Sequence, residues 1–441
     1  MTIQINTPGD LQAVMGTDYQ VSQQQWAAVT APLRPAVVIA GAGSGKTTLM
    51  AARVVYLVAT GQVAPEEVLG LTFTTKAAAG LATSVTRALS GAGLLGEGND
   101  EEEPLEPAVS TYNAYAARLL TEHGLRIGFE PDTRVLADAT RYQVAARAVS
   151  SHTGQIDELS DHRDTVVGNV LALDSAMSEH LVGPGDVIAD GESWRPGFLD
   201  ARNAEAADKH RVSYLEAIDK ALGAINRRAE LVGLVEDYRA LKRRLGVMDF
   251  SEQIELAARL AVEHPEVGAG ERARYKVVLL DEYQDTSVAQ AILLSRLFGE
   301  GHPVMAVGDP NQAIYGWRGA SVSNILNFGS DFSHPDGVPA YQLTVSRRSA
   351  PVILDLANHL AAPLYADLDG VLPLDPAPGR TGGEVHLAVY ETQADELAAL
   401  ADQVGQAHAA MPEPLWREIG VLTRDNRTAA RVFDALSLAE I

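Results

Sequence analysis

Ala40-Gly-Ala-Gly-Ser-Gly-Lys-Thr-Thr48 is the stretch of this sequence that decides the fold. It follows the apolar run Ala36-Val-Val-Ile39 and precedes a helical pattern that begins at Leu49. A strand, a glycine-rich loop ending in Lys-Thr and a helix, in that order, form a phosphate-binding P-loop. The glycines let the backbone curl, so that several N–H groups and the helix N-terminus face a polyphosphate. The stretch therefore predicts binding of a nucleoside triphosphate.

Each position of this loop has an expected role. Lys46 is expected to reach the β and γ phosphates, and the hydroxyl of Thr47 is expected to ligate Mg²⁺. An ordinary glycine-rich turn before a helix is the alternative, and the register of strand, Lys46 and Thr47 disfavours it. The other expected ATP-binding residues of the loop are Gly41, Ala42, Gly43, Ser44, Gly45 and Thr48.

A second motif, Val277-Val-Leu-Leu-Asp-Glu-Tyr-Gln-Asp-Thr286, supplies the hydrolytic half of the site. Its apolar strand delivers Asp281 at the carboxyl edge, where open α/β sheets bind ligands. Asp281 is expected to hold Mg²⁺ through water, and Glu282 to orient and deprotonate the attacking water. An acidic turn after a strand is the alternative. Beside a P-loop, the Asp-Glu pair instead indicates hydrolysis of the bound nucleotide.

Length and composition limit the class of protein. A chain of 441 residues is too long for one compact core, so several domains are expected. Its hydrophobic content of 46% and charged content of 21% are typical of a globular protein. The apolar runs are shorter than the roughly 18 residues of a membrane helix, and the absence of cysteine excludes disulfides and thiolate metal sites. A cytoplasmic location without membrane contact is expected.

The formal net charge of −23 disfavours a sequence-wide affinity for nucleic acid. Binding depends on local patches, however, and the charges of this chain are segregated. Acidic residues crowd into residues 97–106 and 186–208. Basic residues concentrate at Arg227, Arg228, Arg239, Lys242, Arg243 and Arg244.

Periodicity indicates how the chain is organised. Apolar runs at residues 36–40, 68–73, 277–280 and 304–307 are typical of buried parallel strands in an α/β domain. Between residues 111 and 249 strand signals almost vanish, which predicts a helical insertion that splits this domain. After residue 335 the alternation resumes. Strands are expected there at residues 341–343, 384–389 and 418–422, and helices at residues 350–360, 394–410 and 426–438.

Several stretches resemble the motifs of superfamily 1 DNA helicases of the UvrD, Rep and PcrA group. Ala306-Val-Gly-Asp-Pro-Asn-Gln-Ala-Ile-Tyr-Gly-Trp-Arg-Gly-Ala320 resembles motif III. Leu71-Thr-Phe-Thr-Thr-Lys-Ala-Ala-Ala79 resembles motif Ia, and Asp281-Glu-Tyr-Gln-Asp-Thr286 resembles motif II. Gln25 begins a stretch similar to the Q motif. Val109-Ser-Thr-Tyr-Asn113 and Leu343-Thr-Val-Ser-Arg-Arg-Ser349 stand where the family has its Thr-Phe-His motif and motif IV.

The resemblance implies the fold and its domains. It implies a RecA-like P-loop domain 1A with a parallel sheet, formed by residues 1–114 and 247–335 and split by a helical insertion, 1B, at residues 115–246. It implies a partial second RecA-like domain, 2A, at residues 336–441. The family's motifs V and VI are expected after residue 441, so the sequence looks cut short and these residues are expected to form an incomplete motor.

The resemblance also implies the role of single residues. Gln25 would read the adenine edge, Gln312 would sense the γ phosphate, and Arg348 would act as an arginine finger supplied in cis. Arg347 replaces a tyrosine that stacks on adenine, a task that a guanidinium plane can also perform. Ser346, Thr75 and Asn113 depart from the family pattern as well. The residues expected to bind DNA are Phe73, Tyr315 and Trp317, which would stack on bases, and Thr74, Lys76, Thr111 and Arg318, which would hold the backbone.

The function implied is an ATP- and Mg²⁺-dependent translocase and helicase of DNA repair or recombination, nucleoid-associated in a bacterium. It would move 3′ to 5′ along single-stranded DNA and meet single-strand/duplex junctions. An AdnB-type helicase–nuclease motor, working with a second motor or a nuclease subunit, stays open. So does a structural DNA-binding subunit whose ATPase is silent. The alternative to DNA binding for Phe73 and Trp317 is that both are core aromatics. The basic cluster at residues 227–244 either covers DNA phosphates or forms a solvated helix face.

Overall fold

The computed structural model describes residues 3–18, 20–95, 106–208, 211–368 and 370–441. Of the acidic stretch at residues 97–106, residues 97–105 therefore lie outside the described part of the chain. The chain divides into two compact units, Met1–Thr381 and Gly382–Ile441. No helix in the described ranges is both long and apolar enough to cross a membrane.

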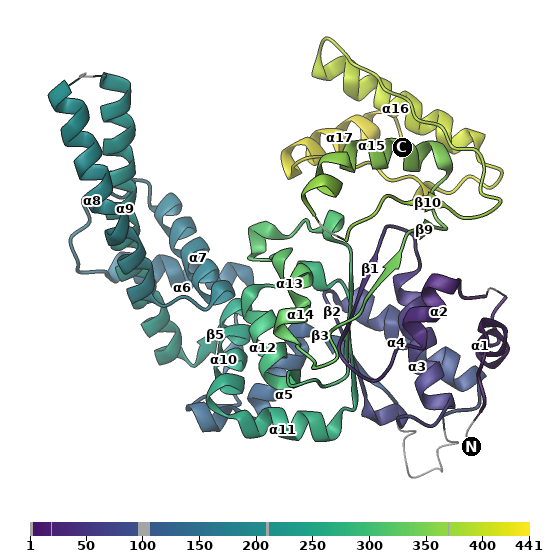
Figure 1. Cartoon of the computed structure of the whole chain (residues 1–441). Helices are drawn as coiled ribbons and strands as arrows, with labels where there is room; N and C mark the ends of the chain where they lie inside the picture. The colour runs from purple at the N-terminus through teal and green to yellow at the C-terminus, as the bar shows by residue number, and fades with distance from the viewer. Residues whose placement is uncertain (1–2, 19, 96–105, 209–210, 369) are drawn as a thin grey trace. The chain divides into compact units, whose positions relative to one another are not determined.

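A six-stranded parallel sheet lies at the centre of the first unit (Figure 1). The strand order is β3-β2-β6-β7-β1-β8. Because β6, β7 and β1 are parallel neighbours, the loops after them lie at the same carboxyl edge of the sheet, where open α/β sheets bind ligands. The strands are β1 (Ala36–Ala40), β2 (Val68–Thr72), β3 (Ala108–Thr111), β6 (Val277–Leu280), β7 (Val304–Gly308) and β8 (Ala340–Leu343).

Helices cover both faces of this sheet, since successive side chains of each strand point to opposite faces. Val38 of β1 lies in one hydrophobic core and its neighbour Val37 in the other. The first core includes α1 (Pro8–Met15), α2 (Gln23–Val29), α3 (Lys46–Ala59) and α4 (Thr75–Gly91). The second core includes α5 (Tyr112–His123), α10 (Phe250–Glu263), α11 (Pro265–Arg274), α12 (Val288–Phe298), α13 (Ser323–Leu326) and α14 (Phe328–Asp331).

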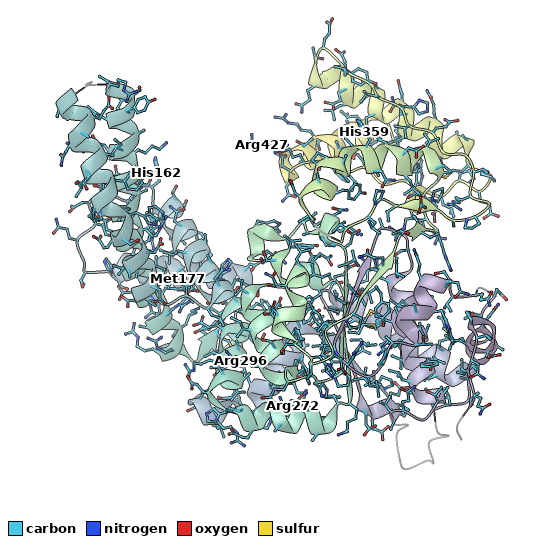
Figure 2. All side chains as sticks on the ribbon, viewed as in Figure 1. His162, Met177, Arg272, Arg296, His359 and Arg427 are labelled. Carbon is cyan, nitrogen blue, oxygen red and sulfur yellow. The ribbon has the colours of Figure 1, made fainter. Side chains whose placement is uncertain are left out.

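The expected helical insertion is confirmed and has a core of its own. It consists of α6 (Asp138–Ser151), α7 (Arg163–His180), α8 (Pro184–Asp208) and α9 (Val212–Leu245), and α8 packs along α9 as a long pair (Figure 1). Met177, labelled in Figure 2, belongs to its core. The short strands β4 (Arg134–Val135) and β5 (Val247–Met248) pair where the chain enters and leaves. This core begins at Leu136, beyond the predicted boundary at residue 114, because α5 packs against the sheet.

The α/β class and its parallel sheet are thus confirmed, but strand β8 differs from the expectation. Residues 341–343, expected to open the second α/β domain, instead pair with β1, with Val38 opposite Tyr341. Leu343 is buried in the first core. The remaining elements of the first unit are β9 (Val345–Ser346), α15 (Pro351–Asp367) and β10 (Asp375–Pro376), with β9 and β10 paired.

The second unit contains α16 (Gln393–Ala410) and α17 (Asn426–Leu438), close to the expected helices. The strands expected at residues 384–389 and 418–422 are absent. Gly382–Ile441 is described throughout and contains no strand. An extended segment becomes a strand only when a neighbour satisfies its backbone groups. Leu387, Val389 and Leu422 are all at least 90% exposed. The 3₁₀ helices of the chain's described part are η1 (Pro65–Glu67), η2 (Gly124–Ile127), η3 (Tyr283–Asp285), η4 (Pro310–Gln312), η5 (Gly316–Arg318) and η6 (Trp416–Glu418).

Candidate active site

The P-loop connects β1 to α3 at the carboxyl edge of the sheet. Gly43 and Gly45 have φ values of 75° and 90°, in the left-handed region that favours glycine. A Cβ added at Gly43 would also lie 2.6 Å from Arg348 Cβ and 2.7 Å from Ser346 Oγ. Gly43 is therefore required twice, by its own backbone and by the chain segment that packs on it.

Gln25 lies against the P-loop and is only 1% exposed. Its Nε2 donates to the carbonyl of Ser44 at 3.1 Å, and its Oε1 accepts from the backbone N–H of Ser22 at 3.0 Å. The Arg347 guanidinium donates to the same Oε1 at 3.2 Å. Gln25 therefore supports the P-loop through its hydrogen bond to Ser44. The predicted reading of adenine stays a prediction.

Arg347 and Arg348 follow β9 and are both exposed. The backbone N–H of Arg347 donates to the carbonyl of Gly43 at 2.9 Å, which brings the predicted adenine-stacking residue directly beside the P-loop. The carbonyl of Arg348 accepts from Arg380 at 2.6 Å. Backbone hydrogen bonds thus hold both arginines, the Arg347 guanidinium also bonds to Gln25, and the Arg348 side chain is exposed.

Asp281 follows β6 and is 5% exposed. Its Oδ2 accepts from the hydroxyl of Thr72 at 3.4 Å, and its carbonyl accepts from the Tyr112 hydroxyl at 2.9 Å. Its Oδ1 is buried and has no hydrogen-bond partner among the described residues. Burial, together with the charge of Glu282, raises the pKa of Asp281 to about 6. A divalent cation would relieve both effects, so this carboxylate fits the predicted Mg²⁺ role.

Lys46 of the P-loop and Glu282 of the second motif are in direct contact. Lys46 Nζ lies 2.7 Å from Glu282 Oε2, and Gln284 Nε2 donates to the same oxygen at 2.9 Å. Glu282 has a φ of 47°, a left-handed conformation that is unusual for a residue with a side chain. Such strain costs about 1–3 kcal/mol and gathers at functional sites. The strained turn directs this carboxylate toward the first residue of α3.

Polar contacts continue from Glu282 to the motif III segment. Gln284 Oε1 accepts from the backbone N–H of Asp309 at 3.0 Å, and Gln312 Nε2 donates to Asp309 Oδ2 at 2.6 Å. Gln284 and Asp309 lie inside the sequence motifs, which predict no role for either of them. Their position between Glu282 and Gln312 was not visible, because it depends on how β6 and β7 lie side by side.

The predicted DNA-binding aromatic residues form one group. The ring centroids of Phe73 and Tyr315 are 4.7 Å apart, and those of Tyr315 and Trp317 are 6.4 Å apart. The Arg318 guanidinium lies 4.6 Å from the Trp317 ring centroid. Phe73 is half-buried, whereas Trp317 is 73% exposed, so Trp317 is not a core aromatic.

The predicted backbone-holding residues lie at the ends of neighbouring strands. Thr111 ends β3 and pairs in register with Thr72 of β2, two residues before Thr74. The hydroxyls of Thr74 and Thr111 accept from the first turns of α4 and α5, at 3.1 Å each. Each hydroxyl still has a proton to donate to a phosphate oxygen. Lys76 and Arg318 are exposed.

Comparison with known proteins decides the family. Residues 21–333 match the family model described as UvrD/REP helicase N-terminal domain. The chain belongs to the UvrD/REP helicase family. It is similar to the ATP-dependent DNA helicase UvrD2 of Mycobacterium tuberculosis, with 30% identity over 426 residues that cover 96% of this chain and 54% of that protein. Identity is 28% with the ATP-dependent DNA helicase PcrA of Leuconostoc citreum, over 77% of this chain and 38% of that protein.

A third relative, DNA helicase II of Escherichia coli, is 27% identical over 340 residues, which cover 77% of this chain and 40% of that protein. The chain therefore spans about half or less of the length of these curated UvrD/REP relatives. Fold and family are shown for it. The activity of the whole protein remains to be proposed.

A bound Mg²⁺ would depend on few protein atoms in this member of the UvrD/REP family. The described residues contain no group of three or more His, Asp or Glu side chains arranged for a metal ion. Mg²⁺ is commonly held by one or two protein oxygens together with substrate phosphates. The exposed hydroxyl of Thr47 and the buried carboxylate of Asp281 suit that sparse arrangement.

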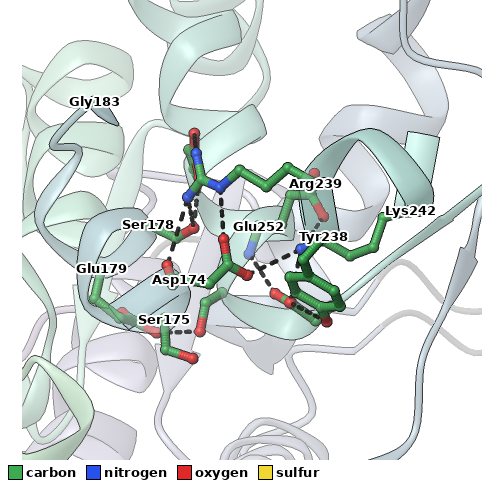
Figure 3. A network of polar contacts seen from close by, with 12 residues as sticks. Asp174, Ser175, Ser178, Glu179, Gly183, Tyr238, Arg239, Lys242 and Glu252 are labelled. Atoms are coloured by element: carbon green, nitrogen blue, oxygen red, sulfur yellow. Dashed lines mark hydrogen bonds and ion pairs between the residues drawn. The ribbon is translucent and has the colours of Figure 1, made fainter. Parts of the chain in front are cut away.

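Two residues of the basic cluster of this UvrD/REP chain, Lys242 and Arg239, match neither interpretation of it. Lys242 is fully buried, with Nζ at 3.1 Å from Asp174, 2.9 Å from Asp249 and 2.8 Å from Glu252 (Figure 3). Arg239 lies 2.5 Å from the other oxygen of Asp174. Both DNA contact and solvation are therefore wrong for Lys242 and Arg239.

The other members of that cluster differ from these two. Arg228 lies 3.7 Å from Asp190 of α8, while Arg243 and Arg244 are exposed in the last turn of α9. The partners of Lys242 lie 68, 7 and 10 residues away along the chain, so the helix periodicity of α9 alone could not identify them.

We expect Asp281→Asn to stabilise the folded protein at pH 8. A carboxyl whose folded pKa is raised to about 6 favours folding most below its ordinary value of 3.8, and that stability is lost as pH rises through 6. The asparagine avoids this loss, which is on the order of 2–3 kcal/mol at about 1.36 kcal/mol per pKa unit. The measurement is the melting temperature from pH 4 to pH 8. The gain should vanish near pH 4, and the exposed control Asp132→Asn should show none.

Proposed function

We propose that this chain is the ATP-hydrolysing motor of a DNA helicase that translocates 3′ to 5′ along single-stranded DNA and uses Mg²⁺. The observation that carries the proposal is the Lys46–Glu282 contact and its continuation through Gln284 and Asp309 to Gln312. Only three residues after Gln312, the aromatic group begins at Tyr315. The nucleotide site and the proposed DNA track thus share one short segment.

ATP binding changes the partners of Lys46 and Glu282 in this proposal. The γ phosphate takes the place of the Glu282 carboxylate beside Lys46 Nζ. Glu282 then remains hydrogen-bonded to Gln284, and its freed oxygen orients a water and accepts a proton from it. Bound Mg²⁺, held by Thr47 and Asp281, supplies charge neutralisation at the phosphates. Arg348 reaches the γ phosphate from the segment after β9.

The same exchange of partners explains how hydrolysis moves DNA. When Glu282 leaves Lys46, the contacts of Gln284 with Asp309 transmit the change to η4 and Gln312. The segment from Tyr315 to Arg318 follows directly and holds the exposed Trp317. Alternating grip and release of a base by this segment gives one step of the strand per nucleotide cycle.

DNA-stimulated ATP hydrolysis and strand displacement by the full-length protein test the proposed function. Duplexes with a single-stranded 3′ tail should be unwound, and duplexes with a 5′ tail should not. A silent structural subunit, the competing function, would bind the tailed DNA and hydrolyse ATP no faster than a Glu282→Gln variant. Unwinding from 5′ tails alone would contradict the proposed polarity.

The protein partners are proposed from two short stretches of sequence. Ser110-Thr-Tyr112 and Ser346-Arg-Arg-Ser349 favour an AdnB-type helicase–nuclease motor, which would work beside a second motor or a nuclease subunit. Co-purification of a nuclease with the tagged chain from its own cells supports this assignment. Recovery of the chain by itself, with unwinding intact, argues for a motor of the UvrD kind.

Trp317→Ala should weaken binding of single-stranded DNA by roughly 1–3 kcal/mol, through the loss of one stacked base. Folding should be unaffected because the ring is 73% exposed. Arg318→Ala should instead flatten the salt dependence by about one phosphate contact. Fluorescence anisotropy of a labelled oligonucleotide across a salt series measures both effects.

Trp194→Ala is the matched control for the tryptophan, because Trp194 is 62% exposed on α8, outside the aromatic group. It should leave the DNA affinity unchanged. A sharp fall in the melting temperature of Trp317→Ala, with the affinity of the folded molecules preserved, would identify Trp317 as a structural residue and remove it from the DNA track.

A further inference from the structure

A short segment, residues 371–376, lies beside the chain that packs on the P-loop; we call it the strap. Its backbone follows the segment after β8, because the N–H of Asp375 donates to the carbonyl of Thr344 at 2.8 Å. Directly after the strap, the N–H of Ala377 donates to the carbonyl of Ser346 at 2.9 Å. The strap is therefore bonded to the residues that lead to Arg347 and Arg348.

One side chain of α15 fixes the strap from the other side. Asn358 Nδ2 donates to the carbonyl of Leu374, and Asn358 Oδ1 accepts from the Leu374 N–H, both at 2.9 Å. The hydroxyl of Tyr365 donates to the same Oδ1 at 3.0 Å. The carboxamide thus satisfies both backbone groups of Leu374, as a neighbouring strand would. Leu374 can move only if these bonds break or its side chain rotates.

The side chain of Leu374 is seated on the P-loop. A Cβ added at Gly41 would lie 2.1 Å from Leu374 Cδ2 and 3.1 Å from both Cδ1 and Cγ. Gly41 and Leu374 also line one cavity of about 210 Å³, together with Ala42, Gln312, Asn358 and Tyr365. The strap therefore reaches the wall that holds the predicted γ-phosphate sensor, Gln312.

We propose that Leu374 is a positioning residue of the nucleotide site. Seated on Gly41 and held by Asn358, it keeps the strap and the segment bonded to it against the P-loop, where Arg347 bonds to Gly43. This sets the place of the Arg348 side chain relative to the phosphates. The inference rests on the proposed function, because positioning Arg348 matters only if ATP is hydrolysed here.

The contact between Leu374 and Gly41 can be tested by creating a steric clash at Gly41 and then removing it. Gly41, unlike Gly43 and Gly45, does not have a left-handed φ. An alanine at this position is opposed chiefly by Leu374, whose atoms are the three nearest neighbours of the added Cβ. Gly41→Ala should therefore force the Leu374 side chain out of its seat, by rotation or by displacement of the strap, and a second change, Leu374→Ala, should remove the clash. Leu372→Ala is the matched control, because Leu372 belongs to the strap but is 49% exposed.

The experiment compares the full-length protein with its variants Gly41→Ala, Gly41→Ala/Leu374→Ala and Gly41→Ala/Leu372→Ala. Amide hydrogen exchange of Arg347, Asp375 and Ala377 reports the position of the strap without any need for activity. ATP turnover and its KM report the site. Since misplacement by about 1 Å can cost roughly 100-fold in rate, Gly41→Ala should lower kcat at least about tenfold, with less effect on KM.

The double variant with Leu374→Ala should recover most of the lost kcat and slow the exchange again, whereas the Leu372→Ala double variant should recover neither. Wild-type turnover in Gly41→Ala, or a double variant that stays slow although folded, overturns the positioning role. If the unchanged full-length protein hydrolyses no ATP with DNA present, the proposed function fails. Hydrogen exchange still shows in that case whether Leu374 holds the strap: exchange in the single variant Leu374→Ala that is as slow as in the unchanged protein rules it out.

Discussion

Lys46→Ala should abolish ATP hydrolysis, with a loss of at least about 100-fold in turnover. The Lys46 ammonium is fixed at the start of α3 and already lies 2.7 Å from Glu282 Oε2, so it is preorganised to meet developing phosphate charge. Its removal also leaves the carboxylates of Asp281, Glu282 and Asp285 without the cation beside them. Turnover at saturating ATP and DNA is the measurement.

A surface lysine provides the matched control for this variant. Lys220 is exposed on α9, and Lys220→Ala should hydrolyse ATP at the wild-type rate. Turnover within a few-fold of wild type in Lys46→Ala would contradict the assignment of the P-loop as the hydrolytic site.

Glu282→Gln separates binding of ATP from its hydrolysis. The glutamine keeps the shape of the side chain but cannot accept the proton of water, so turnover should fall by about 10²–10⁴-fold. Affinity for a fluorescent ATP analogue should persist, because the P-loop backbone and Lys46 are unchanged. It should even rise, since the analogue no longer competes with a charged carboxylate for Lys46. Equal turnover in variant and wild type would mean that another group activates the water.

The P-loop and the Asp-Glu pair were predictable because each is a contiguous stretch whose chemistry follows from neighbouring residues. The buried strands β1, β2, β6 and β7 were predictable for a similar reason. A strand covered on both faces is continuously apolar, and this can be seen in a window of a few residues. Sequence therefore located these four strands and the residues at their carboxyl ends, whereas β3 was not predicted.

Features that depend on distant partners were not predictable in the same way. Alternating apolar residues at 385, 387 and 389 fit a strand, but the pattern does not show whether another strand lies beside them. The run at residues 341–343 was seen, and its partner β1 was not. Gln25 similarly fits a family motif, whereas its hydrogen bond to Ser44 depends on the loop's three-dimensional path.

The buried network around Lys242 also depends on residues that are distant in the sequence, and it contributes to the stability of the insertion. Burial alone would lower the pKa of Lys242, but the charges of Asp174, Asp249 and Glu252 raise it above its usual value. Conversely, burial would raise the pKa of Asp249, and the Lys242 ammonium holds it below the usual range. The network joins α7 and α9 of the insertion to the start of α10, which packs on the sheet (Figure 3).

Lys242→Met should therefore destabilise the protein by about 3–5 kcal/mol at pH 7, because it removes the buried cation that Asp174, Asp249 and Glu252 share. Urea unfolding, followed by a probe in the insertion, gives the free energy. Arg243→Met, one residue further along α9 and exposed, is the matched control and should change it by less than about 0.5 kcal/mol. Lys242→Met should not alter the salt dependence of DNA binding, because Lys242 is fully buried.

The pH dependence of the Lys242→Met deficit separates lost charge from lost packing. In the wild type, the lowered pKa of Asp249 gives stability that is present above its ordinary value of 3.8 and is lost as pH falls through the folded pKa. In the variant, unpaired buried carboxylates have raised pKa values, so they favour folding at low pH and oppose it as pH rises. Both changes make the difference between the two proteins smallest in acid and largest at neutral pH. A deficit that is equal at pH 4.5 and pH 7 would show that Lys242 stabilises the fold through its methylene groups and not through its charge.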